Sequence, residues 1–493
     1  MITKTNYVSF CKCPKSLYLS LFKKEEAEIN EESIRKGNEV GALARSLFGE
    51  YVLVDDEYND MHKKAEITKQ FIEEGKGVIC EASFIFKDLF CAVDILRKVD
   101  NGYELYEVKS TASLSDKEVL LHYYQDIAFQ THVLSKVGIN VVKANLVLLN
   151  NKYIRNGDIE LDKLLRVVNV TDEEVYIKET KKVRDNISKM RLIVDNPRAK
   201  IECKFSGMCT NGSCSFGSYC MRDISDDSVL NLYRCGKRFE LYADGVRTFE
   251  DILHSDYKLS TIQRRQIDYV LNNRNDLYVD KDKINDFLED IKYPMYFLDF
   301  ESINEAIPPY SNCGVYQQVP VQFSLHVLQE NGDLKHYEYV GDGVNDPRDE
   351  VARLLLEYIK NDGGSIVSYN ASFEKGRIEE LKEQLGYKRF DTFEGRYVDL
   401  LDVFRGGYIY NRKMGKSFSI KSTLPALFEN DPELNYNSLV GVHNGGDAMK
   451  AYNSLKHLDD TMKEEVVNQL LKYCELDTYA MVKLYQKIVE LAK

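Results

Sequence analysis

The chain has 493 residues and a net charge of −13, with 44% hydrophobic and 29% charged residues. This composition predicts a globular protein of about three domains. No apolar run approaches the roughly 18 residues that a membrane-spanning helix needs. The acidic balance excludes a surface that is basic throughout, but it leaves room for local contacts with nucleic acid. The N-terminus has lysines but no apolar leader segment, so we expect a cytoplasmic protein without a membrane partner.

Residues 1–222 predict one α/β domain. Its expected helices cover residues 7–22, 34–47, 117–137 and 172–194, and a strand is expected at 144–149. In the third of these helices, Asp126 and Gln130 are one turn apart.

The most informative element of this domain is a predicted β-hairpin. Two strand-like runs, residues 90–96 and 103–109, are separated by Asn101-Gly102, a strong turn signal. With these two residues as the loop, Asp94 lies opposite Lys109, with Glu107 diagonal to Asp94, and all three share one sheet face. The carboxylates can hold a divalent cation and the lysine can orient water, so the trio predicts phosphodiester hydrolysis. The alternative is a solvated sheet face with incidental charges.

Cysteines bracket this domain. In a cytosolic chain, eleven cysteines indicate metal or redox chemistry more than disulfides. Cys13 lies far upstream of a Gly/Ser-rich stretch that holds Cys203, Cys209, Cys214 and Cys220. The remaining isolated cysteines are predicted to be buried small apolar side chains: Cys80, Cys91, Cys235, Cys313 and Cys474.

Residues 223–290 are polar and predict a small helical linker. Residues 245–252 resemble part of a helix-hairpin-helix, with a plain helical linker as the alternative. Residues 291–493 predict a second α/β domain.

This second domain has its own acidic positions. Asp299 and Glu301 alternate along an apolar strand and so share a face. Glu374 opens a helix after the strand at 366–370, and Tyr473 and Asp477 lie on one face of a later helix. The four acids are expected to hold two divalent cations, with Tyr473 positioning the attacking water.

Two further acidic segments are left open as ligand sources. Asp399 or Asp402 could add a carboxylate, and Asp447, in the segment that begins at His443, competes for the role of the last acid. The stretch from Val403 to Phe428 contains no acidic residue. Its basic and aromatic side chains suit a polyanion, or else form an ordinary solvated loop: Arg405, Tyr408, Tyr410, Arg412, Lys413, Lys416, Phe418 and Lys421.

The first half resembles the RecB-type PD-(D/E)XK nucleases of the iron–sulfur subgroup, which includes AddB and the CRISPR-associated RecB-like exonucleases. The resemblance implies a restriction-endonuclease-like fold with Asp94, Glu107 and Lys109 as its catalytic and metal-binding motif. It also implies a [4Fe–4S] cluster on Cys13, Cys209, Cys214 and Cys220. The interval Cys209-x4-Cys214 is longer than usual, which leaves Cys203 as a rival ligand and zinc as a rival metal.

This sequence also departs from the nuclease family in another segment. The family's metal-binding histidine is missing from residues 37–41, where Glu39 is the candidate replacement.

The second half resembles DnaQ-like DEDDy 3′-5′ exonucleases with an RNase H-like fold. Asp299 and Glu301 match the first motif, Glu374 replaces the usual Asp of the second, and Tyr473 and Asp477 match the third. Together the two resemblances cover nearly the whole chain except 223–290, as in a poorly characterised bacterial family that fuses both domains.

These resemblances imply a metal-dependent deoxyribonuclease that uses Mg²⁺ or Mn²⁺. Its C-terminal site would trim 3′ ends, and its N-terminal site would act on DNA ends or single strands in repair or defence. An RNA exonuclease is the alternative enzyme. A non-catalytic nucleic-acid-binding or redox-sensing scaffold with degenerate sites is the alternative of another class.

Overall fold

The computed structural model describes residues 1–54, 60–113, 115–429 and 431–493. They form a mixed α/β protein, which confirms the predicted fold class at that level. The chain forms two compact units: Met1–Asp223 with Glu305–Gln317, and Ile224–Asn304 with Gln318–Lys493. The segment predicted as a separate linker therefore groups with the second unit. No helix among the described residues is both long and apolar enough to cross a bilayer.

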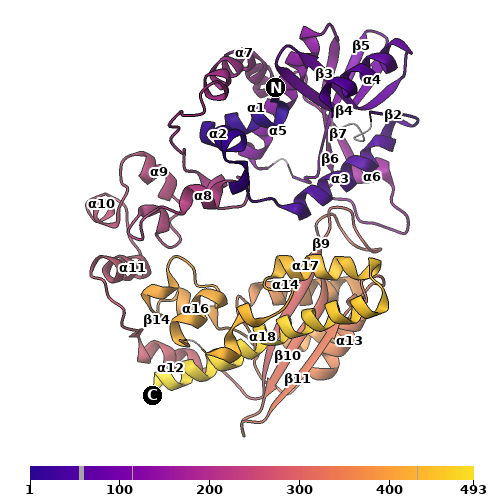
Figure 1. The fold of residues 1–493 in the computed structure, drawn as a ribbon. Helices are drawn as coiled ribbons and strands as arrows, with labels where there is room; N and C mark the ends of the chain where they lie inside the picture. The colour runs from indigo at the N-terminus through magenta and orange to yellow at the C-terminus, as the bar shows by residue number, and fades with distance from the viewer. Residues whose placement is uncertain (55–59, 114, 430) are drawn as a thin grey trace. The chain divides into compact units, whose positions relative to one another are not determined.

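The described part of the first unit contains a seven-stranded sheet in the order β2-β3-β4-β5-β6-β7, with β1 added alongside β4 (Figure 1). Its strands are β1 (Ile2–Thr3), β2 (Val52–Leu53), β3 (Val78–Phe86), β4 (Leu89–Val99), β5 (Gly102–Lys109), β6 (Val141–Leu149) and β7 (Leu165–Asn169). Its helices are α1 (Lys4–Lys12), α2 (Pro14–Phe22), α3 (Glu31–Arg45), α4 (Met61–Glu73), α5 (Lys117–Lys136), α6 (Leu161–Leu164), α7 (Glu174–Val194) and α8 (Gly217–Met221).

Two apolar cores cover the two faces of this sheet. Leu96 and Leu105 pack in a core with α1, α2, α5 and α7, whereas Ile95 and Tyr106 pack with α3. Alternation along β5 therefore places every second side chain toward α5, whereas in β4 it is interrupted between Val93 and Leu96, which pack in the same core.

The predicted hairpin exists, but its register differs from the prediction. Ile95 pairs with Tyr106 and Val99 with Gly102, so the loop residues are Asp100 and Asn101. The glycine at 102 meets a different requirement, because a Cβ there would lie 2.4 Å from the backbone oxygen of Asn140. A shift of two residues still leaves Asp94, Glu107 and Lys109 on one face.

The second unit contains a five-stranded sheet in the order β11-β10-β9-β12-β13, in which β9, β10 and β11 are antiparallel and β12 and β13 run parallel to β9. The strands of the second unit are β8 (Tyr278–Val279), β9 (Met295–Asn304), β10 (Gln318–Leu328), β11 (Leu334–Val340), β12 (Ile366–Ser368), β13 (Tyr397–Asp399) and β14 (Ile409–Tyr410). Of these, β8 and β14 pair with each other outside the five-stranded sheet. Its helices are α9 (Arg238–Ala243), α10 (Phe249–Leu253), α11 (Thr261–Leu271), α12 (Lys281–Glu289), α13 (Arg348–Tyr358), α14 (Ser372–Leu385), α15 (Leu401–Arg405), α16 (Ile420–Leu427), α17 (Gly445–Ser454) and α18 (Asp460–Ala492).

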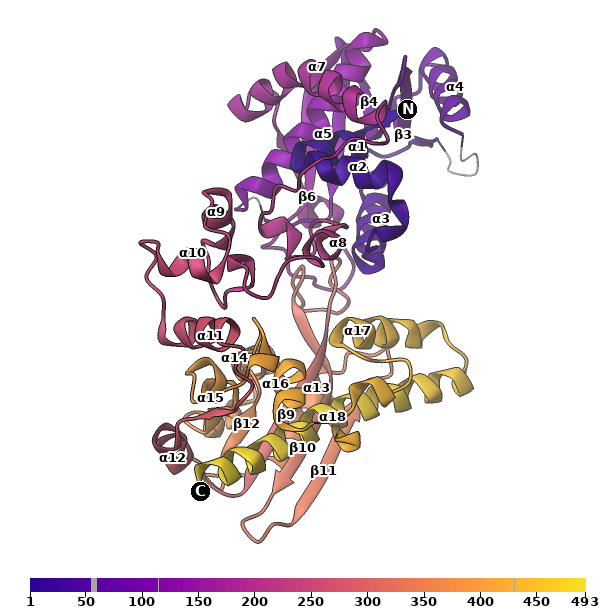
Figure 2. The same ribbon diagram turned by 60° about the vertical axis from the view of Figure 1, so that its left-hand side comes forward.

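The long helix α18 lies across β9 and β10 on one face of this sheet (Figures 1 and 2). Phe297 packs in the core that includes residues of α18, while Leu298 and Phe300 pack with α13 and α14 on the opposite face. Odd-numbered residues of β9 therefore face α18, and Asp299 and Glu301 are among them.

Candidate functional site

Acidic side chains from β9, α14 and α18 line one pocket of about 310 Å³ in the second unit, here called the carboxylate pocket. One carboxylate oxygen from each of Asp299, Glu301 and Asp477 lies within 4.8 Å of the others. Glu374 lines the same pocket but lies outside that closest group. The predicted fifth member, Tyr473, is also part of the wall.

Local structure explains how each acid reaches the pocket. The two acids of β9 point toward α18 because they alternate with the buried Leu298 and Phe300. Tyr473 and Asp477 are one helical turn apart on α18 and face the sheet. Between them, the Cys474 thiol lies 3.7 Å from Asp299 Oδ2, so the helix packs directly against the acidic strand.

Glu374 enters from the first turn of α14, and its Oε2 is buried with no hydrogen-bond partner among the described residues. Asp399 supports the turn before this helix rather than the pocket. Its Oδ1 accepts hydrogen bonds from the backbone N–H of Asn370 at 2.8 Å and of Leu401 at 3.0 Å, and its Oδ2 pairs with Arg405.

The other acids left open by the sequence are also engaged elsewhere. Asp402 pairs with Arg405. Asp447 Oδ2 accepts from the backbone of His443 and from the Asn444 side chain. Asp477 is thus the acid that completes the closest group.

Two residues that sequence reasoning did not assign to this site contact its side chains, and one of them, Lys421, lines the pocket. Lys421 Nζ lies 3.2 Å from the Tyr473 hydroxyl and donates to the His443 carbonyl at 2.7 Å. It also lies over the rings of Tyr436 and Tyr473. The Tyr436 hydroxyl donates to Asp477 Oδ1 at 2.5 Å. Neither residue belongs to a local acidic pattern, so spacing offered no signal for them.

The electrostatics of the carboxylate pocket favour a bound cation. Burial, followed by the charge of Asp477, raises the pKa of Asp299 well above its usual value and that of Glu301 to about 8. Burial likewise raises the pKa of Glu374 to about 8 and that of Asp477 to about 6. Crowded buried carboxylates resist ionisation unless positive charge is added. Divalent cations with oxygen ligands, such as Mg²⁺ or Mn²⁺, fit this donor set.

Of the basic stretch from Val403 to Phe428, only one cation reaches the carboxylate pocket, and that is Lys421. Tyr410 and Phe418, which were candidates for stacking on bases, are instead buried in the core. That interpretation was therefore wrong for both rings, because their apolar area packs against Tyr233 and Tyr269. The other basic side chains have partners in this unit: Arg405 with Asp399, Arg412 with Asp226, Lys413 with Glu429 and Lys416 with Asn231.

The hairpin residues Asp94, Glu107 and Lys109 also gather with α5, as their shared face predicted. Lys109 Nζ lies 2.6 Å from Glu107 Oε1 and 2.7 Å from Asp126 Oδ2. Gln130 Nε2 donates to both Glu107 and Asp126. Asp94 Oδ2 accepts a hydrogen bond from the backbone N–H of Val108 at 2.7 Å. This side-chain contact joins β4 to β5 beyond Ile95 and Tyr106, where their backbone pairing ends.

Lys4 is the unpredicted member of this hairpin cluster. Its Nζ lies 3.0 Å from Glu107 Oε1 and 3.4 Å from Asp94 Oδ1. Burial alone would lower the pKa of Lys4, but Asp94 and Glu107 outweigh burial and raise it. Burial and the neighbouring acids raise the pKa of Glu107 to about 7. Two lysines therefore already compensate these acids, and a cation bound between Asp94 and Glu107 would have to displace Lys4.

Nearby, Glu81 interacts with Asp94, and burial, followed by that charge, raises its pKa. Glu39, the candidate replacement for the missing histidine, instead pairs with Arg35 at 2.7 Å. Glu81 is therefore the acid that borders Asp94.

All five predicted metal-binding cysteines line one small cavity in the first unit: Cys13, Cys203, Cys209, Cys214 and Cys220. The Cys203 thiol interacts with those of Cys13, Cys209 and Cys220. A clustered set of free thiols suits a metal ion or an iron–sulfur cluster. The five isolated cysteines are buried, as predicted.

The spacing of these thiols bears on the choice of metal. Within the described ranges, the cysteines do not form a group of three whose sulfur atoms all lie within 4.8 Å of one another. A single zinc ion with Zn–S bonds of about 2.3 Å would need sulfur atoms about 3.8 Å apart. The Cys203 thiol nevertheless lies within hydrogen-bond range of three of the other thiols, so the spacing does not distinguish zinc from a larger centre.

Comparisons with known proteins do not assign a function. Residues 296–419 match the family described as a domain of unknown function (DUF2779), a stretch that holds Asp299, Glu301 and Glu374 but ends before Tyr473. The chain is similar to the uncharacterized protein UU173 of Ureaplasma parvum, at 26% identity over 235 residues, covering 42% of this chain and 33% of that protein. It is also similar to the uncharacterized protein MG366 of Mycoplasma genitalium, at 22% identity over 445 residues, covering 79% of this chain and 66% of that protein. The chain thus spans about a third of the first relative and about two thirds of the second.

Proposed function

We propose that the second unit is a metal-dependent exonuclease that removes nucleotides from the 3′ end of single-stranded DNA. The observation that carries this proposal is the carboxylate pocket, where four acids from three separate elements meet beside Tyr473 and Lys421. Burying this much like charge is costly unless a cation compensates it. The resemblance to DEDDy exonucleases suggests that digestion starts at the 3′ end of the strand.

Asp299, Glu301 and Asp477 would hold the cations, with Glu374 completing the set. Bound there, divalent cations would neutralise the charge that develops on a phosphodiester during hydrolysis. The hydroxyl of Tyr473 would hold and orient the attacking water. Its ordinary form is the neutral phenol, because burial and the charge of Asp477 raise its pKa.

Lys421 would contribute in two ways. Burial raises the pKa of Glu301 and of Asp477, and the ammonium of Lys421 opposes that rise, which favours the ionised ligands. It also lies at the pocket wall, where it could contact a substrate phosphate.

In the first unit, Asp94, Glu107 and Lys109 would form a second hydrolytic site for DNA ends or single strands. The compensation of its acids by Lys4 makes this site the weaker candidate for a resident cation. The cysteine cluster would hold a [4Fe–4S] cluster that ties Cys13 to the loop after α7, with zinc as the alternative.

The test uses purified full-length protein with single-stranded DNA and RNA, labelled at either end, in Mg²⁺ or Mn²⁺. We expect stepwise shortening of DNA from its 3′ end, and we expect Asp299→Asn to reduce that rate at least about 100-fold, since it removes a carboxylate ligand. The exposed Asp286→Asn is the matched control and should retain wild-type activity. Lys109→Ala should leave 3′ trimming intact while removing any cleavage by the first unit.

Three outcomes would count against this proposal. No cleavage of either polymer with any metal would leave the non-catalytic scaffold as the better reading. Preferential shortening of RNA would favour the RNA exonuclease. Full activity in Asp299→Asn would show that the carboxylate pocket is not the active site.

A further inference from the structure

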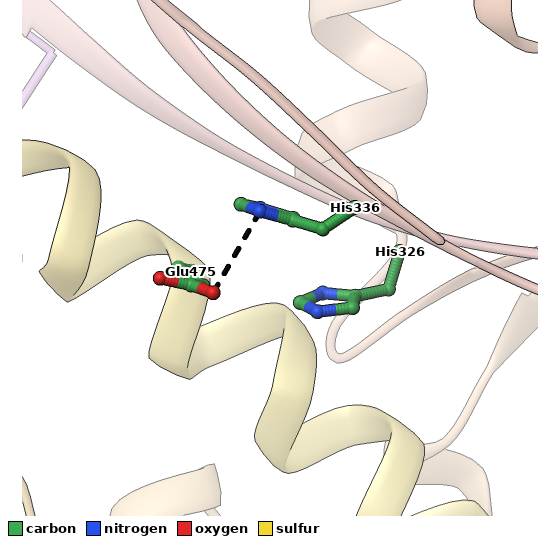
Figure 3. A group of neighbouring side chains, drawn as sticks. All are labelled: His326, His336 and Glu475. Atoms are coloured by element: carbon green, nitrogen blue, oxygen red, sulfur yellow. Dashed lines mark ion pairs between the residues drawn. The ribbon is translucent and has the colours of Figure 1, made fainter. Parts of the chain in front are cut away.

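A second group of side chains suited to metal lies on the α18 face of the second sheet and does not line the carboxylate pocket. His326 on β10 and His336 on β11 are direct cross-strand partners, and their rings stack with centroids 4.4 Å apart. From α18, Glu475 Oε1 lies 3.7 Å from His336 Nδ1 (Figure 3). One nitrogen of each ring and one oxygen of Glu475 all lie within 4.8 Å of one another.

Hydrogen bonds to the remaining ring nitrogens fix how these histidines can act. His326 Nδ1 lies 2.8 Å from the Thr478 hydroxyl, and His336 Nε2 lies 2.9 Å from the Ser324 hydroxyl. The two hydroxyls lie 2.7 Å apart, and that of Thr478 donates to the Glu475 carbonyl at 3.1 Å. All of these hydrogen bonds can form together when His326 donates its Nδ1–H to Thr478 and His336 donates its Nε2–H to Ser324. His326 Nε2 and His336 Nδ1 then keep their lone pairs, as histidine ligands of metals do.

Charge also favours a metal here. His326 is only 4% exposed. Glu475 is half-exposed, and the Glu338 carboxylate lies 4.0 Å from His336 Nε2. The group thus combines two imidazoles with negative charge at a position that solvent can reach.

We propose that His326, His336 and Glu475 form a zinc site separate from the carboxylate pocket. Two imidazole nitrogens and one carboxylate suit Zn²⁺, whereas Mg²⁺ prefers oxygen ligands. A zinc ion at this site would tie the β10–β11 hairpin to α18, the helix that also carries Tyr473 and Asp477. Three protein ligands leave a fourth position for water. The proposal does not depend on nuclease activity.

The test measures zinc bound per chain by full-length protein equilibrated with buffered free Zn²⁺ in excess Mg²⁺. The excess Mg²⁺ occupies oxygen-rich sites, and any zinc held by the cysteines is the same in every variant. We expect His336→Gln and Glu475→Gln each to bind about one zinc fewer than the wild type. Zinc should also raise the Tm of the wild type more than that of either variant.

The control is His457→Gln, which removes an exposed histidine of the same unit and should leave the stoichiometry unchanged. Glu475 is half-exposed, so its variant keeps the test valid if His336→Gln folds poorly. Equal zinc content in the wild type and Glu475→Gln would overturn the proposal and leave the pair as a stacked, hydrogen-bonded histidine pair. Loss of zinc on adding Mg²⁺ would overturn it as well.

Discussion

The phenol of Tyr436 donates a 2.5 Å hydrogen bond to Oδ1 of Asp477, although the two residues lie 41 positions apart in the chain. This bond lowers the pKa of Asp477 and opposes the effect of burial. Tyr436 therefore favours the ionised form of the proposed metal ligand and fixes its orientation. It acts as a positioning residue, because it touches the ligand rather than the reacting atoms.

Tyr436→Phe should weaken metal binding in the carboxylate pocket. Outer partners of metal ligands typically contribute about 10–100-fold to affinity or activity. We expect the Mn²⁺ concentration for half-maximal 3′ trimming to rise by about 10-fold, with the larger effect at lower pH, because Asp477 protonates more readily. The measurement is the trimming rate as a function of Mn²⁺ concentration and pH.

Tyr387→Phe provides the matched control, since Tyr387 also donates to an aspartate, Asp349, at 2.8 Å, and neither residue lines the carboxylate pocket. It should leave the Mn²⁺ dependence unchanged. If Tyr436→Phe behaves in the same way as Tyr387→Phe, the hydrogen bond has no role in cation binding.

Glu374→Gln should stabilise the metal-free protein at alkaline pH while impairing activity. The folded-state pKa of Glu374 is raised to about 8, above the roughly 4.3 of an unperturbed glutamate. Its protonation therefore contributes stability that is fully present below about pH 4 and is lost as pH rises through 8. Glutamine does not ionise and keeps that contribution.

Thermal unfolding in EDTA from pH 5 to pH 9 measures this effect. The Tm of Glu374→Gln should exceed that of the wild type by several degrees near pH 9, and the two should converge toward pH 5. Added Mn²⁺ should raise the wild-type Tm most at high pH, because the acids must lose protons to bind it. A Tm difference that does not change with pH would contradict the assigned cause.

Lys4→Met should destabilise the first unit and make it responsive to divalent cations. The change removes the ammonium that pairs with Glu107 at 3.0 Å, and removing one partner of a buried ion pair typically costs about 3–5 kcal/mol. Because Lys4 is half-buried, we expect the lower end of that range. Mn²⁺ should restore more stability to this variant than it adds to the wild type.

Lys163→Met is the control for Lys4→Met, since its pair with Glu160 is exposed to solvent and contributes little to stability. The measurement for both is denaturant unfolding with and without Mn²⁺. An unchanged cation response in Lys4→Met would mean that Lys4 does not occupy a cation position.

The cysteine cavity makes a spectroscopic prediction. Protein purified without oxygen should be brown and contain iron, as a [4Fe–4S] cluster requires. Cys214→Ser should lose the colour, whereas Cys203→Ser should keep it, because the predicted ligands are Cys13, Cys209, Cys214 and Cys220. Iron and zinc content measured alongside absorbance distinguishes the alternatives. Zinc without iron, lost in Cys203→Ser but not in Cys214→Ser, would favour the four-thiolate zinc site instead.

Local periodicity was sufficient for much of this protein. The two-residue repeat of a strand places Asp299 with Glu301, and Glu107 with Lys109, whatever the rest of the chain does. One helical turn likewise places Tyr473 beside Asp477. The mixed α/β class and most helices follow from the same patterns, because they depend on neighbours a few positions away.

Long-range packing decided the remainder. The hairpin register was mispredicted by two residues because the requirement for Gly102 comes from the close approach of Asn140, which directly precedes β6. Tyr410 and Phe418 looked like exposed stacking rings until the fold buried them. Lys4, Tyr436 and Lys421 reach the acids from distant segments, and sequence spacing carries no information about such approaches. The sequence by itself thus determined which side chains share a face, whereas only the tertiary structure decided which faces meet, because that depends on the packing of the whole core.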